Sequence, residues 1–148
     1  MAEWSAHAQE TLSGAGYRRG GAREAVIELL DRQPCALSVL DIEDRLRAGA
    51  GRTVGRASIY RAVDELVSLD LLTRVDVGDG VARYEPQRSH HHHHLVCDGC
   101  GRLEPFEDDA LERAIRGLAD RVSFDISDHD VTLHGCCENC RTAASANV

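Results

Sequence analysis

Residues 90–100 read HHHHHLVCDGC, a run of five histidines that passes into a Cys-x-x-Cys pair, Cys97 and Cys100. A second pair at the same spacing, Cys137 and Cys140, lies near the C-terminus. A two-residue spacing lets both thiolates of a pair bind one tetrahedral ion, and two pairs complete a four-sulfur zinc site. A redox dithiol is the weaker alternative. We therefore predict a structural Zn²⁺ held by these four cysteines.

The histidine run supplies more ligands than the zinc site needs. Side chains alternate along an extended strand, so His91 and His93 would face one side and His92 and His94 the other. One strand can thus contribute to two further metal sites of a different kind. Each site needs ligands from elsewhere, and the candidates are Glu85, Glu112, His129 and His134. This pattern indicates a protein that senses metal as well as being stabilised by it.

The composition fits a soluble globular protein. The chain has 148 residues, 43% of them hydrophobic, with no apolar run long enough to span a bilayer. Its N-terminus does not resemble a signal peptide, so we expect a cytoplasmic protein. In that reducing compartment Cys-x-x-Cys pairs are metal ligands or redox thiols more often than structural disulfides. Cys136, beside the second pair, is interpreted as a spare buried thiol.

The charge pattern restricts how the chain could bind nucleic acid. The formal net charge is −8, and all 17 basic residues are arginine. Most arginines lie between Arg18 and Arg83. DNA binding would therefore depend on a local arginine face and not on overall charge. The alternative is that these arginines reflect genomic base composition on solvated helix faces.

The N-terminal part, residues 1–86, has the order of a winged helix-turn-helix. Apolar residues recur at helical spacing from Ala22 to Leu30, and this first helix should end before Pro34. Ser38 and Asp41 form a capping box for a second helix. A turn from Gly49 to Gly55 leads to a third helix, whose core face is Ile59, Val63 and Leu66. A hairpin from Val75 to Tyr84 would turn at Asp79-Gly80.

The third helix would be the recognition helix. In this motif its N-terminal half offers side chains to bases and phosphates in the major groove. Arg56, Ser58, Tyr60 and Arg61 occupy that half. We predict Tyr60 and Arg61 as base or phosphate contacts and Arg56 as a phosphate contact. The alternative places Tyr60 in the core and Arg61 on a solvated surface.

Residues 87–148 predict a second, smaller α/β domain. Strands are expected at 93–97 and 102–106, and a helix with Leu111 and Ile115 on its apolar face should begin near Asp108 and Asp109. Alternating apolar residues at 122–126 and 131–133 predict two more strands. Such an antiparallel sheet has an open edge that commonly pairs with a copy of itself. The predicted fold class is α+β, with a dimerisation domain following a winged helix.

Several motifs together resemble the ferric uptake regulator family of metal-responsive bacterial repressors. They are the ASIYR segment at 57–61, the hairpin ending in Tyr84-Glu85, the stretch 90–100 and the segment 135–140. The family implies a homodimer that binds palindromic, double-stranded operator DNA when metal closes the domains. Gly16-Tyr17-Arg18 and Arg23 also fit its first helices, which adds Arg18 and Arg23 to the DNA-binding candidates. Gly20-Gly21 stands where the family usually has a Thr-Pro cap.

The resemblance also implies two ligand sets beside the four cysteines. One lies inside the dimerisation domain and comprises His91, His93, Glu112 and His129. The other, an interdomain regulatory site, comprises Glu85, His92 and His94. The regulatory metal would be Zn²⁺ or Fe²⁺, with Mn²⁺ or Ni²⁺ possible.

The chain departs from the family pattern at the regulatory site. A histidine often supplied before the second helix is replaced by Ala36, and the usual acid after the first Cys-x-x-Cys falls on Pro105. The regulatory cysteine of zinc-type members would fall near Gln87. Cys35, beside Ala36, is either a soft ligand that would favour zinc or a buried core thiol.

The sequence therefore predicts a metal-dependent transcriptional repressor and not an enzyme, because no nucleophile–base pair stands beside the histidines. Neither a membrane nor a small-molecule substrate is expected as a partner. One alternative is a zinc-dependent hydrolase that activates water at an open metal position beside His91 and His93. Another is a metal-buffering protein. Peroxide sensing through oxidation of a ligand histidine is compatible with the same residues.

Overall fold

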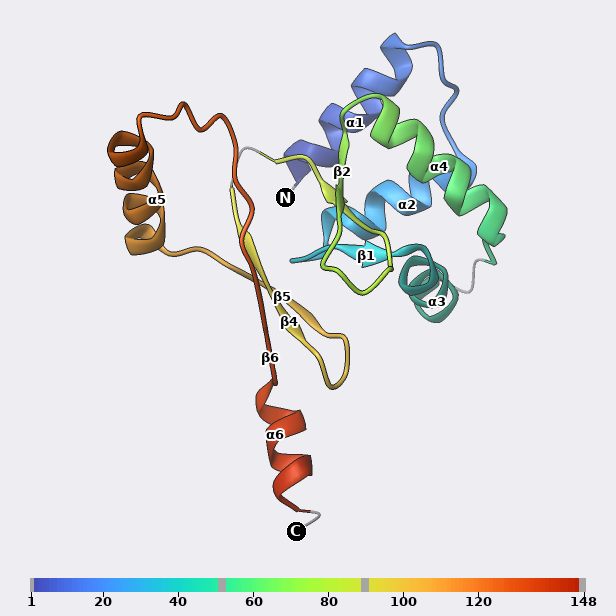
Figure 1. The fold of residues 1–148 in the computed structure, drawn as a ribbon. Coiled ribbons are helices and arrows are strands. Elements are labelled where there is room, and N and C mark those ends of the chain that lie inside the picture. The colour runs from blue at the N-terminus through green and yellow to red at the C-terminus, as the bar shows by residue number, and fades with distance from the viewer. Residues whose placement is uncertain (1, 51–52, 89–90, 147–148) are drawn as a thin grey trace. The chain divides into compact units, whose positions relative to one another are not determined.

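The computed structural model describes residues 2–50, 53–88 and 91–146 (Figure 1). It divides into two compact units, Met1–Ser89 and His90–Val148, which are described separately. Part of the expected turn at 49–55 and the first histidine of the run, His90, lie outside the described residues. No helix among the described residues is both long and apolar enough to cross a membrane.

Four helices form the bulk of the first unit: α1 (Ala2–Gly14), α2 (Gly21–Asp31), α3 (Val39–Ala50) and α4 (Arg56–Ser68). Helix α1 was not expected from the sequence, because its apolar residues are few and widely spaced. Trp4, Ala8 and Leu12 recur every fourth residue, and all three lie in the hydrophobic core. The Trp4 indole Nε1 donates to the Leu71 carbonyl oxygen at 3.1 Å. Helix α1 is thus an integral part of this unit.

The three predicted helices of the first unit are confirmed. Helix α2 ends at Asp31, before Pro34. The capping box at the start of α3 is reciprocal, because the Ser38 N–H donates to Asp41 Oδ2 at 2.9 Å and the Asp41 N–H to Ser38 Oγ at 3.1 Å. The core face of α4 is buried as predicted, at Ile59, Ala62, Val63 and Leu66. Tyr60, Arg61 and Asp64, which lie away from this core face of α4, are exposed.

A small antiparallel sheet completes the first unit, in the order β1 (Leu37–Ser38), β3 (Arg83–Pro86), β2 (Leu72–Val75). The last pair in the hairpin is Val75 with Arg83, so the predicted two-residue turn is wrong and the loop spans 76–82. The Arg83 guanidinium donates to both Asp79 carboxylate oxygens, at 3.0 and 2.7 Å. This pairing lowers the pKa of Asp79 and closes the wider loop with side chains.

The second unit contains β4 (His93–Cys97), β5 (Leu103–Phe106), α5 (Asp109–Val122), β6 (Thr132–Gly135) and α6 (Glu138–Ser145). Its sheet has the order β5-β4-β6, as Figure 1 shows. The α+β class is confirmed. One detail differs, because β6 pairs with β4 in parallel and only β5 pairs with it antiparallel.

The strand predicted through 122–126 is wrong. Helix α5 continues to Val122 and ends at Ser123, which adopts the left-handed conformation with φ of 52°. Residues 124–131 then run without strand pairing to β6. The alternating apolar residues had suggested a strand, but Val122 falls one helical turn after Leu118 and extends the helix instead. At the other end of α5, the Asp108 carboxylate accepts from the Leu111 N–H at 2.8 Å, as expected of an N-cap.

Candidate metal centres and DNA-binding surface

The four cysteines come from three places in the second unit. Cys97 ends β4, Cys100 follows in the turn to β5, Cys137 is the N-cap of α6, and Cys140 lies in its first turn. Their sulfur atoms all lie within 4.8 Å of one another, and the Cys100 and Cys137 sulfurs are 3.9 Å apart. Four sulfurs about 2.3 Å from a tetrahedral zinc would be about 3.8 Å apart. The cluster therefore has the size that zinc requires.

The pKa values of these thiols also favour the binding of a cation. The Cys137 N–H donates to Cys97 Sγ at 3.3 Å, and this bond, with that from the Cys100 N–H, lowers the pKa of Cys97 to about 6. The pKa of Cys140 is raised, because its thiol is hydrogen-bonded to the sulfurs of Cys137, Cys97 and Cys100. Four thiols this close cannot all ionise without a positive charge among them. A divalent cation would remove that conflict.

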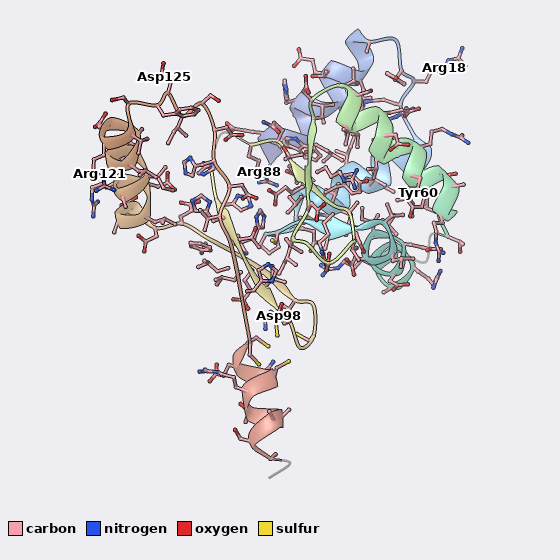
Figure 2. The ribbon with its side chains drawn as sticks, viewed as in Figure 1. Arg18, Tyr60, Arg88, Asp98, Arg121 and Asp125 are labelled. Carbon is pink, nitrogen blue, oxygen red and sulfur yellow. The ribbon has the colours of Figure 1, made fainter. Side chains whose placement is uncertain are left out.

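The roles of two residues near the four cysteines, Gly99 and Asp98, were not predicted from the sequence. A Cβ at Gly99 would lie 3.1 Å from Cys140 Sγ and 3.3 Å from Cys140 Cβ. A residue larger than glycine at position 99 would therefore crowd the Cys140 side chain. The position of Gly99 between Cys97 and Cys100 could have indicated a close approach of this kind, because glycine has no Cβ. Asp98 Oδ1 lies 3.1 Å from His134 Nδ1 and links the turn to β6. Sulfur atoms gather close to the labelled Asp98 in Figure 2.

Cys136 differs from its predicted state. Its side chain is exposed, so the interpretation as a buried thiol is wrong. Its sulfur is also not among the four that lie within 4.8 Å of one another. The reason is that residue 136 precedes α6, whereas Cys137 and Cys140 are placed by the start of that helix.

A second cluster joins β4 to helix α5. His91, His93, Glu112 and His129 each present a ligand atom, and all four atoms lie within 4.8 Å of one another. The Glu112 carboxylate lies 2.6 Å from His93 Nε2 and 3.0 Å from His129 Nε2. Three imidazoles and one carboxylate form a donor set suited to Zn²⁺ or another first-row divalent ion.

The hydrogen bonds of this cluster orient its ligands. The Val131 N–H donates to His93 Nδ1 at 3.2 Å, which directs His93 Nε2 toward Glu112. The bonds from His93 and then His129 lower the pKa of Glu112, so its carboxylate is ionised. A divalent ion bound here would take the place of the protons that now link the imidazoles to Glu112.

The residues predicted for the interdomain site belong to both units. Glu85 lies in β3 of the first unit, where it pairs with Thr73 of β2. In the second unit the rings of His92 and His94 have centroids 5.1 Å apart, and His94 Nδ1 lies 3.7 Å from Asp130 Oδ1. The assignment of Glu85, His92 and His94 to one site stays a prediction.

The DNA-binding candidates divide into exposed and paired side chains. Tyr60 is 48% exposed, which contradicts the alternative of a core tyrosine, and Arg61 and Arg18 are exposed too. Ser58 is half-buried at the start of α4. Arg56 is paired with Glu43 at 2.7 Å. Arg18 and Tyr60 lie on the same side of the first unit in the view of Figure 2.

Arg23 is the second paired candidate. Its guanidinium lies 2.6 Å from the Glu65 carboxylate. The acids Glu43 and Glu65 could not be identified as partners from the sequence, because 13 and 42 residues separate them from their arginines.

The family model described as "Ferric uptake regulator family" matches residues 14–134. The chain is 32% identical over 136 residues to the ferric uptake regulation protein of Bacillus subtilis strain 168, which covers 89% of this chain and 91% of that protein. The fold is similar to that of the Helicobacter pylori ferric uptake regulator, described as having three functional metal-binding sites, with a TM-score of 0.80 at 21% identity over 95% and 93% of the two chains. It is also similar to a zinc uptake regulator complexed with zinc and DNA, with a TM-score of 0.60 at 23% identity over 97% of each chain.

Proposed function

The chain belongs to the ferric uptake regulator family of metal-responsive, DNA-binding transcription regulators, and we propose that it represses genes by binding palindromic operators as a homodimer when its regulatory metal site is filled. Family members are regulators and not enzymes, and the hydrolase and metal-buffering alternatives gain no support from the relatives. One observation carries the proposal: a winged helix with an exposed recognition surface shares a chain with ready-made clusters of metal ligands. A repressor of this kind acts in the cytoplasm, on double-stranded DNA.

Each metal site has a separate role in the proposal. Cys97, Cys100, Cys137 and Cys140 hold structural Zn²⁺, and the cluster around Glu112 is a second site within the same unit. We propose that Glu85, His92 and His94 bind the regulatory metal. This metal is Zn²⁺ or Fe²⁺, with Mn²⁺ and Ni²⁺ also compatible with imidazole and carboxylate ligands. The three functional metal sites of the Helicobacter pylori regulator support this number of sites.

The DNA-binding surface is centred on α4. Tyr60 and Arg61 contact bases or phosphates in the major groove, and Arg18, Arg56 and Ser58 contact the flanking phosphates. A hollow in the surface lies where α2 and α4 begin, lined by Gly21, Ala22, Thr53, Val54, Gly55 and Ser58. Backbone N–H groups at helix N-termini attract phosphate, which supports DNA binding on this side. The zinc uptake regulator solved with DNA supports the same function.

The homodimer is supported by an apolar surface on the second unit. Helix α5 has no buried residue, although Leu111, Ile115, Leu118 and Val122 recur along one face. Val122 and Phe124 are 55% and 69% exposed. Monomeric proteins rarely leave so continuous a set of large apolar side chains in water. A second copy of the chain would cover this face by an isologous contact, and the two winged helices would then match the two halves of a palindrome.

The recognition surface is tested by Arg61→Ala and Tyr60→Phe. Each variant should weaken operator binding about tenfold, because each removes a group that meets a base or a phosphate, while metal content and dimerisation stay unchanged. For Arg61→Ala the slope of log affinity against log salt should also fall by about one. Fluorescence anisotropy at several salt concentrations measures both quantities. Arg113→Ala, an equal charge change on α5, is the control; unchanged affinity in both test variants would place the recognition surface elsewhere.

A further inference from the structure

The loop between α1 and α2, residues 15–20, is rich in glycine, and Tyr17 within it packs against the hydrophobic core. Gly16, Gly20 and Gly21 adopt positive φ values of 88°, 114° and 68°. Gly20 is the N-cap of α2 and offers no side-chain hydrogen bond to the helix. Such glycines have more conformational freedom to lose than any other residue. The loop nevertheless carries Arg18, one of the arginines proposed to meet DNA.

One side chain joins this loop to the recognition helix. The Arg23 Nε and Nη2 atoms donate to Glu65 Oε2 at 2.8 and 2.6 Å, and Nη1 donates to the Arg18 carbonyl oxygen at 3.1 Å. The guanidinium carbon also lies 4.7 Å from the centre of the Tyr17 ring. Arg23 and Glu65 are each only 21% exposed. A second, exposed bond from Arg19 to Gln9, at 2.6 Å, holds the loop to α1 but not to α4.

Glu65 connects the bonds made by Arg23 to the part of α4 that is proposed to meet DNA. Glu65 follows Arg61 by four residues on α4, so the two side chains share a helix face one turn apart. Arg23 is neutralised by Glu65 and already donates through Nε, Nη1 and Nη2, which leaves it poorly suited to bind phosphate itself. We propose that Arg23 and Glu65 are positioning residues, which hold the backbone at Arg18 so that the Arg18 side chain meets a phosphate beside the site of Arg61. This inference rests on the proposed DNA-binding function.

The substitution Glu65→Gln distinguishes a positioning role of Glu65 from a purely electrostatic one, because the two roles predict opposite changes in DNA affinity. Removing an acid from a DNA-binding unit should tighten binding or leave it unchanged if only charge matters. If Glu65 positions Arg18, binding should instead weaken about tenfold, which corresponds to about 1.4 kcal/mol. The salt slope should fall by about one, because Arg18 would no longer meet its phosphate. Asp64→Asn makes the same charge change one residue away and should not weaken binding.

A double-mutant cycle with Arg18→Ala tests the pathway. Adding Glu65→Gln to Arg18→Ala should cost little further affinity, because both changes remove the same phosphate interaction. The probe is a duplex selected from random sequence by the zinc-loaded wild-type protein. Hydrogen exchange of the amides at 16–20, measured without DNA, should be faster in Glu65→Gln than in the wild type or in Asp64→Asn.

The outcomes distinguish the two proposals. Unchanged exchange in Glu65→Gln would overturn the anchoring of the loop. Faster exchange with equal or tighter DNA binding would overturn the positioning role and leave the DNA-binding function intact. A wild-type protein that selects no duplex would overturn the proposed function and the positioning role with it, whatever the exchange result.

Discussion

Replacement of Cys97 or Cys140 by serine is expected to unfold much of the second unit at temperatures where the wild type is folded. Within the described part of that unit, the buried hydrophobic residues are Val96 and Cys97, and α5 and α6 bury none. So small a core cannot stabilise the unit, whereas thiolate–zinc binding supplies roughly 10–16 kcal/mol in small zinc peptides. Thermal unfolding followed by circular dichroism, with zinc content measured on the same samples, tests this. Dimerisation should be lost together with the metal.

Cys136→Ser is the matched control for the cysteine variants. Its thiol is exposed and its sulfur lies outside the set of four, so the change should leave zinc content and stability close to those of the wild type. Equal damage from Cys136→Ser and Cys137→Ser would show that the second pair has been assigned in the wrong register.

Substitution of His92 or His94 by alanine is expected to abolish the response of operator binding to metal. A ligand that favours the DNA-binding form couples the two equilibria, typically by 5- to 150-fold, and that factor is lost with the site. Glu85→Ala should act in the same direction. The zinc content of the four cysteines should not change, because no one of these residues belongs to that cluster. Operator affinity at saturating metal, measured for each variant, gives the loss directly.

His134→Ala is the control for the histidine variants, since His134, at first a candidate ligand, pairs with Asp98 and belongs to neither ligand set implied by the family resemblance. It should retain the full metal response. A His94→Ala protein with a wild-type response would exclude the proposed regulatory site and direct attention to the cluster around Glu112.

The sequence predicted the elements whose signals are local. The capping box at Ser38 and Asp41, the strand at 93–97 and the helix start near Asp108 and Asp109 depend on neighbouring residues and are confirmed. Helix α1 was missed although Trp4, Ala8 and Leu12 recur at helical spacing, because one apolar residue per turn in a polar segment does not show that the helix packs against the core. The hairpin loop was predicted too tight, because the pairing of β2 with β3 stops at Val75 and Arg83, and the ion pair between Arg83 and Asp79 closes the longer loop.

In the sites too, ligands with a local sequence signal could be predicted, and contacts between distant residues could not. Cys-x-x-Cys spacing fixes two ligands by itself, so the four-cysteine cluster could be predicted. The partners of Arg23 and Arg56 could not, because Glu65 and Glu43 come from other helices and look like ordinary surface acids in the sequence. The ligand set around Glu112 was implied only by family resemblance, since α5 must fold back beside β4 before Glu112 can meet His93.

Operator binding as a function of regulatory metal shows whether this protein is a metal-dependent repressor. Protein that keeps zinc in its four cysteines, but is stripped of other metal, is titrated with Zn²⁺, Fe²⁺, Mn²⁺ or Ni²⁺ in the absence of oxygen, and its affinity for a selected operator duplex is measured. We predict weak binding without added metal and binding about 100-fold tighter with the physiological metal, with DNA raising the affinity for that metal by the same factor. Equal operator affinity in the stripped protein and in all four metal-loaded forms would contradict it.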